Sequence, residues 1–399
     1  MTTLLQEALA IKEETIATRR DIHRHPELGF EETRTSAIVA ERLKELGLAV
    51  STGIAETGVI GLLRGTADSP VLLLRFDMDA LPITEDTGVD YASENPGKMH
   101  ACGHDSHVAV GLSAAKLLAD HRLEIPGTIK FVFQPAEEGG GGAMRMVEAG
   151  VLENPKPDYS MGMHVWNDKP VGWYALKPGP IMAGAEIFTV KITGKGGHGA
   201  SPHQSVDPVV TVAQIITALQ TITSRNVAPL DSAVVSVCKV DAGTAFNIIP
   251  QEVTFYGTIR TFKASVYEEV KGRFTNIVEN TAKAMGCEAQ VEIERVTYPV
   301  SNDPDLAALM KEVIEGVDAH AVVDKTHQTM GAEDFSFMMR DIPGCFVMVG
   351  SANPEEGLDY AHHHPKFNID ETCLPYAVAL IAKGALEILE KDPKSVEMA

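Results

Sequence analysis

The sequence predicts an α/β protein in which a smaller domain is inserted into a larger domain with a mostly parallel sheet. Helical patterns alternate with short apolar runs up to about residue 180 and again after about residue 300, and this alternation is typical of parallel α/β sheets. The middle of the chain instead follows the order β-α-β-β-α-β, which is the ferredoxin-like plan. We therefore place the larger domain at 1–183 and 297–399 and the inserted domain at 184–296.

The larger domain is predicted from compact apolar strands and from helices with one apolar face. In the segments 35–47 and 107–121, apolar residues recur at three- and four-residue spacing, which indicates amphipathic helices. Further helices are expected at the N-terminus and over 303–317 and 374–391. The expected strands are 59–65, 71–76, 128–133, 159–165 and 345–350.

The inserted domain begins with residues 185–194, which alternate between apolar and polar side chains like a strand with one face in water. Each of its two expected helices connects two strands, as the ferredoxin-like plan requires. The elements expected next are a helix over about 207–224, strands over 232–243 and 252–262, a helix over 265–286 and a strand over 288–296.

Composition limits the class of protein and its partners. A chain of 399 residues with 44% hydrophobic and 22% charged residues is typical of a soluble globular protein large enough for two cores. The net charge of −21 argues against nucleic acid as a partner, because phosphate binding needs a basic surface. We expect no membrane span, because no run of about 18 apolar residues is present, and no signal peptide. The five widely spaced cysteines indicate reduced thiols and a cytoplasmic protein.

The segment MHACGHDSHVAV, residues 99–110, concentrates chemically reactive side chains. Cys102 and His104 are two residues apart, so both can face the same way in an extended segment. The pair could bind a metal ion, form a reactive thiol or have no chemical role, and alone it is a weak signal. A helix follows with Asp105 or Ser106 as the expected N-cap, and its dipole would favour a thiolate at Cys102.

Carboxylates and a further histidine follow other apolar runs. In open α/β sheets, ligands bind beyond the carboxyl ends of the strands, so residues far apart in sequence can meet there. Glu137 and Glu138 lie between Pro135 and a run of glycines, where one carboxylate could bind a metal ion while the other handles protons. Asp79 follows one predicted strand and His164 ends another.

Near the C-terminus, His362, His363 and His364 lie together in a predicted loop. Thiolate, imidazole and carboxylate groups form a mixed ligand set, which suits Zn²⁺, Mn²⁺, Ni²⁺ or Co²⁺ better than Ca²⁺ or Mg²⁺. The candidate ligands outnumber those that one tetrahedral ion takes, so a site for two ions bridged by one ligand accommodates them better. The sequence therefore predicts two divalent metal ions per subunit.

A series of motifs stands in order along almost the whole chain: HRHPELGFEE (23–32), RFDMDALPI (75–83), MHACGHDSH (99–107), FQPAEEGGGGA (133–143), GGHGASPH (196–203), AFNIIP (245–250), GAEDFSF (331–337) and HHPKFNID (363–370). In these motifs the chain resembles the co-catalytic metallopeptidase-like amidohydrolases that include aminoacylases and carboxypeptidases. It is most similar to the branch of hippurate hydrolases, N-acyl-amino-acid amidohydrolases and auxin-conjugate hydrolases. The resemblance implies a two-metal catalytic domain and an inserted lid domain that forms a homodimer or homotetramer.

The resemblance also implies a ligand set. Cys102 stands where most of the wider family has a bridging aspartate, and Asp77 stands where it has a ligand histidine. His104 would supply the missing imidazole, and Cys102 would bridge the two ions. The implied metal ligands are Cys102, His104, Glu138, His164 and His363.

Roles beyond metal binding follow from the same motifs. Glu137 corresponds to the general base, and Asp79 or Asp105 would orient a ligand histidine. Lid residues would stabilise the oxyanion and hold the carboxylate of the substrate. These lid residues are His198 for the oxyanion, and Asn247 and Arg260 for the carboxylate.

Together these features predict a metal-dependent hydrolase that cleaves the amide bond of N-acyl or N-aroyl amino acids, such as hippurate, to a carboxylic acid and a free amino acid. A dipeptidase or an N-acetyl-diaminopimelate deacetylase is the alternative on the same fold. A thiol enzyme with Cys102 as nucleophile and His104 or His107 as base is an alternative of another class. A third alternative is a non-catalytic binding protein, against which the intact pair Glu137 and Glu138 argues.

Overall fold

The structure is a computed structural model that describes residues 3–392. It contains two compact units. Unit 1 comprises 3–181, 301–327 and 334–392, and unit 2 comprises 182–300 and 328–333.

Unit 2 extends a few residues beyond the predicted insert at each end and includes a short segment, 328–333, that the sequence assigned to the larger domain. Backbone pairing explains this addition. The N–H of Ala183 donates to the carbonyl oxygens of Thr329 and Gly331, at 3.2 and 3.1 Å. Residues 328–333 therefore pair with the backbone just before the first strand of unit 2. Hydrophobic periodicity does not reveal this pairing.

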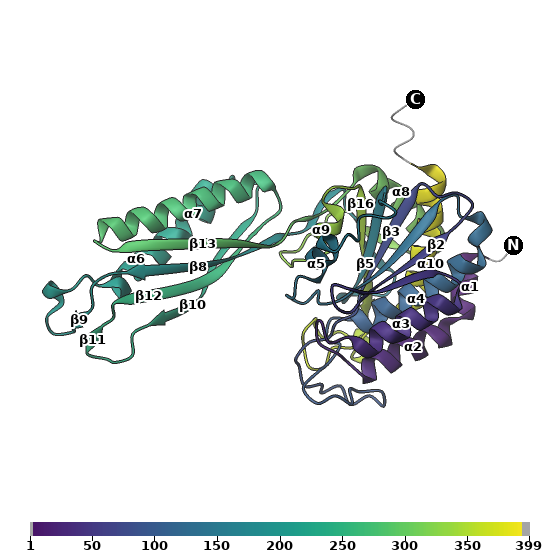
Figure 1. Cartoon of the computed structure of the whole chain (residues 1–399), viewed down its shortest axis with the longest axis horizontal. Helices are drawn as coiled ribbons and strands as arrows, with labels where there is room; N and C mark the ends of the chain where they lie inside the picture. Colours follow the sequence, from purple (N-terminus) through teal and green to yellow (C-terminus); the bar gives the residue numbers. More distant parts are fainter. Residues whose placement is uncertain (1–2, 393–399) are drawn as a thin grey trace, which may run out of the picture. The chain divides into compact units, whose positions relative to one another are not determined.

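Unit 1 is built on an eight-stranded sheet with the order β1-β2-β4-β3-β5-β16-β6-β15 (Figure 1). Its centre, from β4 through β3 and β5 to β16, is parallel, and antiparallel pairs occur toward both edges. Every residue of β3 and β4 is buried, which is why these strands are continuous apolar runs in the sequence. The strands are β1 (Ala49–Ile54), β2 (Gly58–Arg64), β3 (Val71–Asp77), β4 (Thr128–Gln134), β5 (Tyr159–Pro170), β6 (Trp173–Ala175), β15 (Val322–Asp324) and β16 (Gly344–Ala352).

Helices cover this sheet, and α4 packs against both β3 and α10. The segment Glu371–Lys391, mostly α10, is the part of residues 3–392 long and apolar enough to cross a membrane, yet 72% of its apolar window is buried, as in a core helix. The helices of unit 1 are α1 (Leu4–Ala10), α2 (Lys12–Arg24), α3 (Thr33–Glu45), α4 (His104–Asp120), α5 (Gly142–Glu148), α8 (Pro304–Val317), α9 (Ser336–Met339) and α10 (Leu374–Lys391). Short turns of helix are η1 (Arg122–Glu124), η4 (Pro354–Glu356) and η5 (Glu371–Cys373).

Helix α4 begins earlier than its apolar periodicity predicts. Its first residue is His104, and its N-cap is Gly103 with φ 88°, so the expected caps Asp105 and Ser106 lie inside the first turn. A side chain at Gly103 would need this unfavourable φ, and its Cβ would lie 2.4 Å from Val165 Cγ2. The glycine therefore permits the sharp turn that separates Cys102 from the helix.

Unit 2 has the predicted β-α-β-β-α-β order. Its antiparallel sheet has the order β10-β12-β8-β13, and α6 and α7 pack together on one face (Figure 1). Apolar residues every fourth position along α7, such as Val270, Phe274 and Val278, form its buried stripe. The elements are β8 (Gly184–Thr193), β9 (Gly197–His198), η2 (Pro202–Gln204), α6 (Pro208–Thr221), η3 (Ile222–Asn226), β10 (Ala233–Ala242), β11 (Ile248–Ile249), β12 (Glu252–Thr261), α7 (Ala264–Ala284) and β13 (Glu288–Thr297), with β7 (Gly179–Met182) and β14 (Val300–Asn302) where the chain passes between units.

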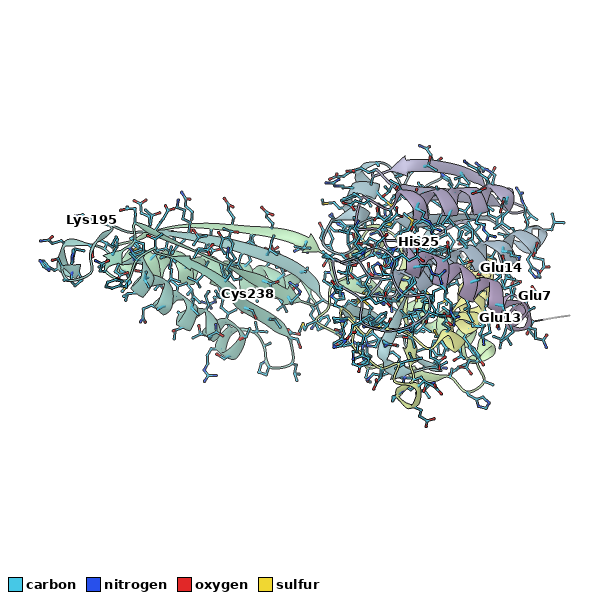
Figure 2. All side chains as sticks on the ribbon, turned by 90° about the horizontal axis from the view of Figure 1, so that it is seen from below. Glu7, Glu13, Glu14, His25, Lys195 and Cys238 are labelled. Carbon is cyan, nitrogen blue, oxygen red and sulfur yellow. The ribbon has the colours of Figure 1, made fainter. Side chains whose placement is uncertain are left out.

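The exposed side chains include acidic residues of unit 1 and one cysteine of unit 2. Glu13 and Glu14 on α2 are exposed (Figure 2), and Glu14 pairs with Lys116 of α4. Thr15 and Arg19 of the same helix are buried. Cys238 on β10 is exposed (Figure 2), whereas Cys287, Cys345 and Cys373 are buried. The described residues contain no disulfide, and all five cysteines are free.

Candidate metal centre

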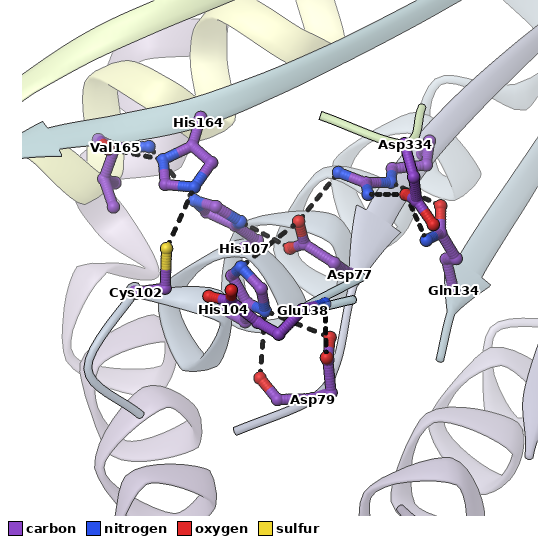
Figure 3. A network of polar contacts seen from close by, with 12 residues as sticks. Asp77, Asp79, Cys102, His104, His107, Gln134, Glu138, His164, Val165 and Asp334 are labelled. Atoms are coloured by element: carbon purple, nitrogen blue, oxygen red, sulfur yellow. Dashed lines mark hydrogen bonds and ion pairs between the residues drawn. The ribbon is translucent and has the colours of Figure 1, made fainter. Parts of the chain in front are cut away.

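Segments that are distant in sequence bring the predicted ligands together in unit 1 (Figure 3). Asp79 follows β3, and Glu138 follows β4 on the glycine-rich turn. Cys102 and His104 stand at the start of α4, and His164 lies within β5. Because β3, β4 and β5 are parallel neighbours, their carboxyl ends deliver these side chains to one edge of the sheet.

Cys102 is common to two groups of potential ligand atoms. Its sulfur, a ring nitrogen of His104 and one of His164 lie within 4.8 Å of one another, and Cys102, Glu138 and His363 form a second such group. Cys102 Sγ is 3.5 Å from His164 Nε2, and His363 Nε2 is 3.1 Å from Glu138 Oε1. One thiol thus lies between two sets of donors, which is the position of a bridging ligand.

His104 is oriented by the residue that follows β3. Its Nδ1 donates to the backbone oxygen of Asp79 at 2.9 Å and lies 3.2 Å from the carboxylate Oδ1 of the same residue. The other nitrogen, Nε2, is buried, makes no hydrogen bond and lies 3.5 Å from Asp77 Oδ2. A buried imidazole with one nitrogen fixed by a protein oxygen and the other without a hydrogen bond is the usual arrangement of a metal-binding histidine.

His164 and His107 lie side by side but have different bonding. His164 Nδ1 donates to the Val165 carbonyl at 2.6 Å, which leaves Nε2 facing Cys102. His107 uses both nitrogens, because Nδ1 bonds to the Asp77 carboxylate and Nε2 accepts from the Val165 N–H at 3.0 Å. His107 therefore fixes the strand that carries His164 and has no nitrogen left for a metal ion.

The three C-terminal histidines are also distinguished by their partners. His362 donates through Nε2 to the Val165 carbonyl at 3.0 Å, and His364 stacks on Tyr360 with ring centroids 4.7 Å apart. His363 alone of the three is placed beside Glu138. It adopts a positive φ of 67°, and its N–H donates to the Ala101 carbonyl at 2.8 Å, which ties its loop to the segment carrying Cys102.

The turn that carries Glu137 and Glu138 is closed by a tight backbone contact. A Cβ on Gly142 would lie 1.7 Å from the Pro135 carbonyl oxygen, so only glycine fits there. The Glu138 N–H donates to Asp79 Oδ2 at 2.9 Å, and Glu138 Oε1 is buried. Asp79 therefore contacts both the candidate ligand His104 and the backbone of the candidate ligand Glu138.

The electrostatics of the centre favour cations. Burial opposes a charge on His104, but the Asp77 carboxylate, together with the contacts to Asp79 and Cys102, raises the pKa of His104 well above its ordinary value. Burial, aided by Glu138, raises the pKa of the Cys102 thiol well above its ordinary value. The thiolate expected from the helix dipole is therefore not favoured by the protein alone, which weakens the interpretation of Cys102 as a nucleophile. The open nitrogen, sulfur and oxygen donors fit two divalent metal ions.

The sequence predicts that Asp79 or Asp105 orients a ligand histidine. Asp79 contacts His104, whereas Asp105 contacts none of the candidate ligand histidines. Its Oδ2 accepts from Arg19 Nε at 3.0 Å and bonds to His23 Nδ1 at 2.8 Å. Burial opposes a charge on Asp105, but Arg19 and His23 together hold the pKa of this carboxyl well below its ordinary range. The physical reason is helix geometry: because Asp105 follows His104 within the first turn of α4, the two side chains point in different directions.

His198, Asn247 and Arg260 all lie in unit 2. His198 is exposed on β9, and the Asn247 carbonyl accepts from the Gly199 N–H at 2.8 Å, so both residues lie at the small antiparallel sheet of β9 and β11. Arg260 lies on β12, half-buried, with Nη1 donating to the Ile259 carbonyl at 3.1 Å. Their roles toward a substrate remain predictions.

Sequence reasoning missed a buried support of the centre. Arg75 on β3 donates to Asp77 at 2.7 Å, to Gln134 at 2.8 Å and to Asp334 at 3.1 Å. These contacts fix Asp77, which in turn holds His107. A charged residue inside the apolar run VLLLRF was the available signal, because a buried arginine needs acidic partners.

Comparisons with known proteins identify the family of the chain. Residues 73–387 match Peptidase family M20/M25/M40. The chain is 42% identical over 381 residues to IAA-amino acid hydrolase ILR1-like 4 of Arabidopsis thaliana, covering 94% of this chain and 85% of the relative. It is 40% identical over 385 residues to N-acetyl-L-cysteine deacetylase of Bacillus subtilis, covering 96% and 90%.

Among solved structures, the chain is similar to a Bacillus subtilis protein described as a dinuclear metal-binding peptidase of the M20 family. The two share 36% sequence identity and a TM-score of 0.84, over 96% of this chain and 99% of the other. The family match covers most of the chain, and the relatives are at least 40% identical over nearly its whole length. The chain belongs to peptidase family M20/M25/M40, in its branch of metal-dependent amidohydrolases.

Proposed function

We propose that this protein hydrolyses the amide bond of N-acyl or N-aroyl amino acids to a carboxylic acid and a free amino acid. The observation that carries the proposal is the position of Cys102 between two ligand groups, beside a turn that presents Glu137 and Glu138 together. The names of the Arabidopsis and Bacillus relatives, a hydrolase of IAA-amino acids and a deacetylase of N-acetyl-L-cysteine, support this substrate class. Hippurate and related N-aroyl amino acids are the finer form of the proposal.

The reaction needs a nucleophile, a proton carrier and a stabilised carbonyl oxygen. Cys102, His104, Glu138, His164 and His363 would hold two divalent ions, whose Lewis acidity polarises the amide carbonyl and lowers the pKa of water. Glu137, on the same turn as a ligand, takes the proton of the attacking water and delivers it to the leaving nitrogen. Adjacent residues on an extended turn point in different directions, so Glu137 and Glu138 divide these tasks.

Unit 2 would supply the contacts that recognise the amino-acid part. An arginine presents a planar pair of donors that match a carboxylate, which suits Arg260 to the free carboxylate of the substrate, with Asn247 beside it. His198 would donate to the developing oxyanion. We further propose that unit 2 forms the interface of a homodimer or homotetramer, that Mn²⁺, Zn²⁺, Ni²⁺ or Co²⁺ serves as the ion, and that the enzyme acts in the cytoplasm.

A substrate screen tests the proposal. Purified protein with added Mn²⁺ is offered N-acetyl, N-benzoyl and indole-acetyl amino acids, and release of the free amino acid is measured. The Glu137→Gln variant, purified in the same way, controls for contaminating hydrolases. We expect turnover of at least one N-acyl class and little turnover of the dipeptide Ala-Gly. Hydrolysis of Ala-Gly without hydrolysis of any N-acyl amino acid would assign a dipeptidase instead.

A further inference from the structure

Glu32, the last residue of the motif HRHPELGFEE, has no role in the function described so far. It stands at the N-cap of α3, but its side chain does not cap that helix. The residue is fully buried. Its Oε1 accepts from the Ala136 N–H at 2.9 Å, and its Oε2 accepts from the Thr57 hydroxyl at 2.6 Å. An N-cap side chain usually accepts a hydrogen bond from its own helix. The Glu32 carboxylate instead accepts from the turn before Glu137.

Ala136 has an unusual backbone conformation. Its φ is 50°, in the left-handed region that non-glycine residues rarely adopt. Such conformations persist where the surroundings hold them in place. A Cβ on Gly29 or on Gly140 would lie 2.8 or 2.7 Å from the Ala136 Cβ, so two glycines allow the chain to close around this residue. Because Ala136 immediately precedes Glu137, its φ and ψ set the direction in which the Glu137 side chain leaves the turn.

The backbone of the neighbouring residue is held separately. Asp79 Oδ2 accepts from the Glu138 N–H at 2.9 Å. Two buried carboxylates thus fix two successive parts of the turn, Glu32 before the proposed general base and Asp79 at the proposed metal ligand. Loss of the Glu32 contact should therefore disturb Glu137 more than Glu138.

We propose that Glu32 is a positioning residue for Glu137, acting through the Ala136 N–H. The inference rests on the proposed function, because it assigns the purpose of the contact to proton transfer by Glu137. Burial raises the pKa of Glu32 to about 7, and the neutral and ionised carboxyl groups both retain an oxygen that can accept from Ala136. The acceptor oxygen, and not the charge, is therefore the required property.

The test compares Glu32→Ala with Glu32→Gln. Glutamine keeps a carbonyl oxygen for Ala136 and can donate its amide to Thr57, whereas alanine removes both contacts. We expect Glu32→Ala to lower kcat by about 10- to 100-fold with little change in KM or metal content, because a small misplacement of a catalytic group has effects of this size. Glu32→Gln should recover most of the kcat.

Glu27→Ala is the matched control. Glu27 lies in the same motif, and its carboxylate accepts from the N–H groups of Arg34 and Thr35, both at 2.8 Å, without a contact to the turn. It should lower the unfolding temperature while leaving kcat close to that of the wild type. If Glu32→Ala does not fold, Glu32→Asp, whose shorter side chain withdraws the oxygen from Ala136, should show the same loss of kcat.

Hydrogen–deuterium exchange over residues 135–138 provides a measurement independent of activity. Exchange should accelerate in Glu32→Ala and not in Glu27→Ala or Glu32→Gln. Equal kcat in Glu32→Ala and Glu27→Ala, or a loss in Glu32→Gln as large as that in Glu32→Ala, would overturn the proposal. If the wild type hydrolyses no N-acyl amino acid, the proposed function fails, while the exchange data still report whether Glu32 holds the turn.

Discussion

The residues proposed for catalysis differ sharply between the two units. In unit 1, His104 is fully buried and His164 is 6% exposed, and each has one ring nitrogen fixed by a protein oxygen. In unit 2, His198 and Asn247 are exposed, and Arg260 is half-buried beside its own strand. The histidines His104 and His164 of unit 1 are thus buried and held by hydrogen bonds, whereas the residues proposed to contact the substrate from unit 2 are mostly exposed.

The difference indicates two kinds of task. Metal ligands and a general base need fixed geometry. Most of the residues proposed for these tasks follow a strand or begin a helix, near the buried carboxylates Asp77 and Asp79, whereas His363 is exposed on a loop. Groups that recognise a substrate gain from being accessible, because binding can order them. Unit 1 should therefore supply the ions and the general base, while unit 2 should decide which substrates are used and, through His198, assist turnover.

Removal of metal should have the largest effect. Dialysis against a strong chelator should abolish hydrolysis, because the proposed reaction depends on metal ions to polarise the amide carbonyl. Addition of Mn²⁺, Co²⁺, Ni²⁺ or Zn²⁺ should restore activity. Binding of ions should also raise the unfolding temperature of unit 1, since a ligand stabilises the state that binds it. Full activity in protein shown by elemental analysis to be metal-free would contradict the assignment of the centre.

Substitutions among the three C-terminal histidines should separate a ligand from its neighbours. His363→Ala should lose both metal and activity, because His363 lies beside Glu138. His364→Ala should keep most of both, since that ring stacks on Tyr360 at the surface. Metal content and kcat are measured for each variant. Greater damage from His362→Ala than from His363→Ala would show that the loop presents a different histidine.

Arg260→Ala should change substrate preference more than turnover. Loss of a hydrogen bond to a charged group is worth about 1.5–3 kcal/mol, which corresponds to a rise in KM of roughly 10- to 100-fold for a substrate with a free carboxylate. A substrate whose carboxylate is amidated should be penalised in the wild type and much less in the variant. An equal loss with both substrates would make Arg260 a structural residue of β12.

The smallest effect is expected from pH, through a buried carboxyl group in unit 2. Burial raises the pKa of Glu186 to about 7, despite Arg295 at 3.0 Å. Since this value lies above the ordinary 4.5, folding favours the protonated form, and that stabilisation is complete below about pH 4.5 and lost as pH rises through 7.

The unfolding temperature of unit 2 should therefore fall over this interval, and Glu186→Gln should reduce the fall. Exposed Glu252 on β12 provides the control, because Glu252→Gln should leave the pH profile unchanged. A profile of Glu186→Gln identical to that of the wild type would contradict the expected titration.

Much of the fold could be predicted from hydrophobic period alone. The strand 71–76 and the helix 374–391 were expected where β3 and α10 occur, because continuous burial and a buried stripe leave clear patterns. Helix starts were less accessible. The beginning of α4 depends on the φ of Gly103 and its contact with Val165, which no periodic pattern records.

The candidate site divides in the same way. Motif resemblance selected His363 from the triplet, and the structure places that residue beside Glu138, but the residues alone left all three histidines open. Arg75 is visible in the sequence as a charge inside an apolar run, but its partner Asp334 and the Glu32 partner Ala136 are distant in sequence, so these contacts could not be predicted. Chemistry-bearing residues stand in short motifs, whereas the residues that orient them depend on tertiary contacts.

The central claim is that Glu138 binds metal and Glu137 carries the proton. Its most direct test is metal content, measured by mass spectrometry, beside kcat for Glu137→Gln and Glu138→Gln. Glu137→Gln should keep nearly the full metal complement and turn over about 10²- to 10⁴-fold more slowly, without rescue by added Mn²⁺. Glu138→Gln should lose metal and recover part of its activity at high Mn²⁺. Loss of metal in Glu137→Gln with retention in Glu138→Gln would reverse the two roles and contradict the account.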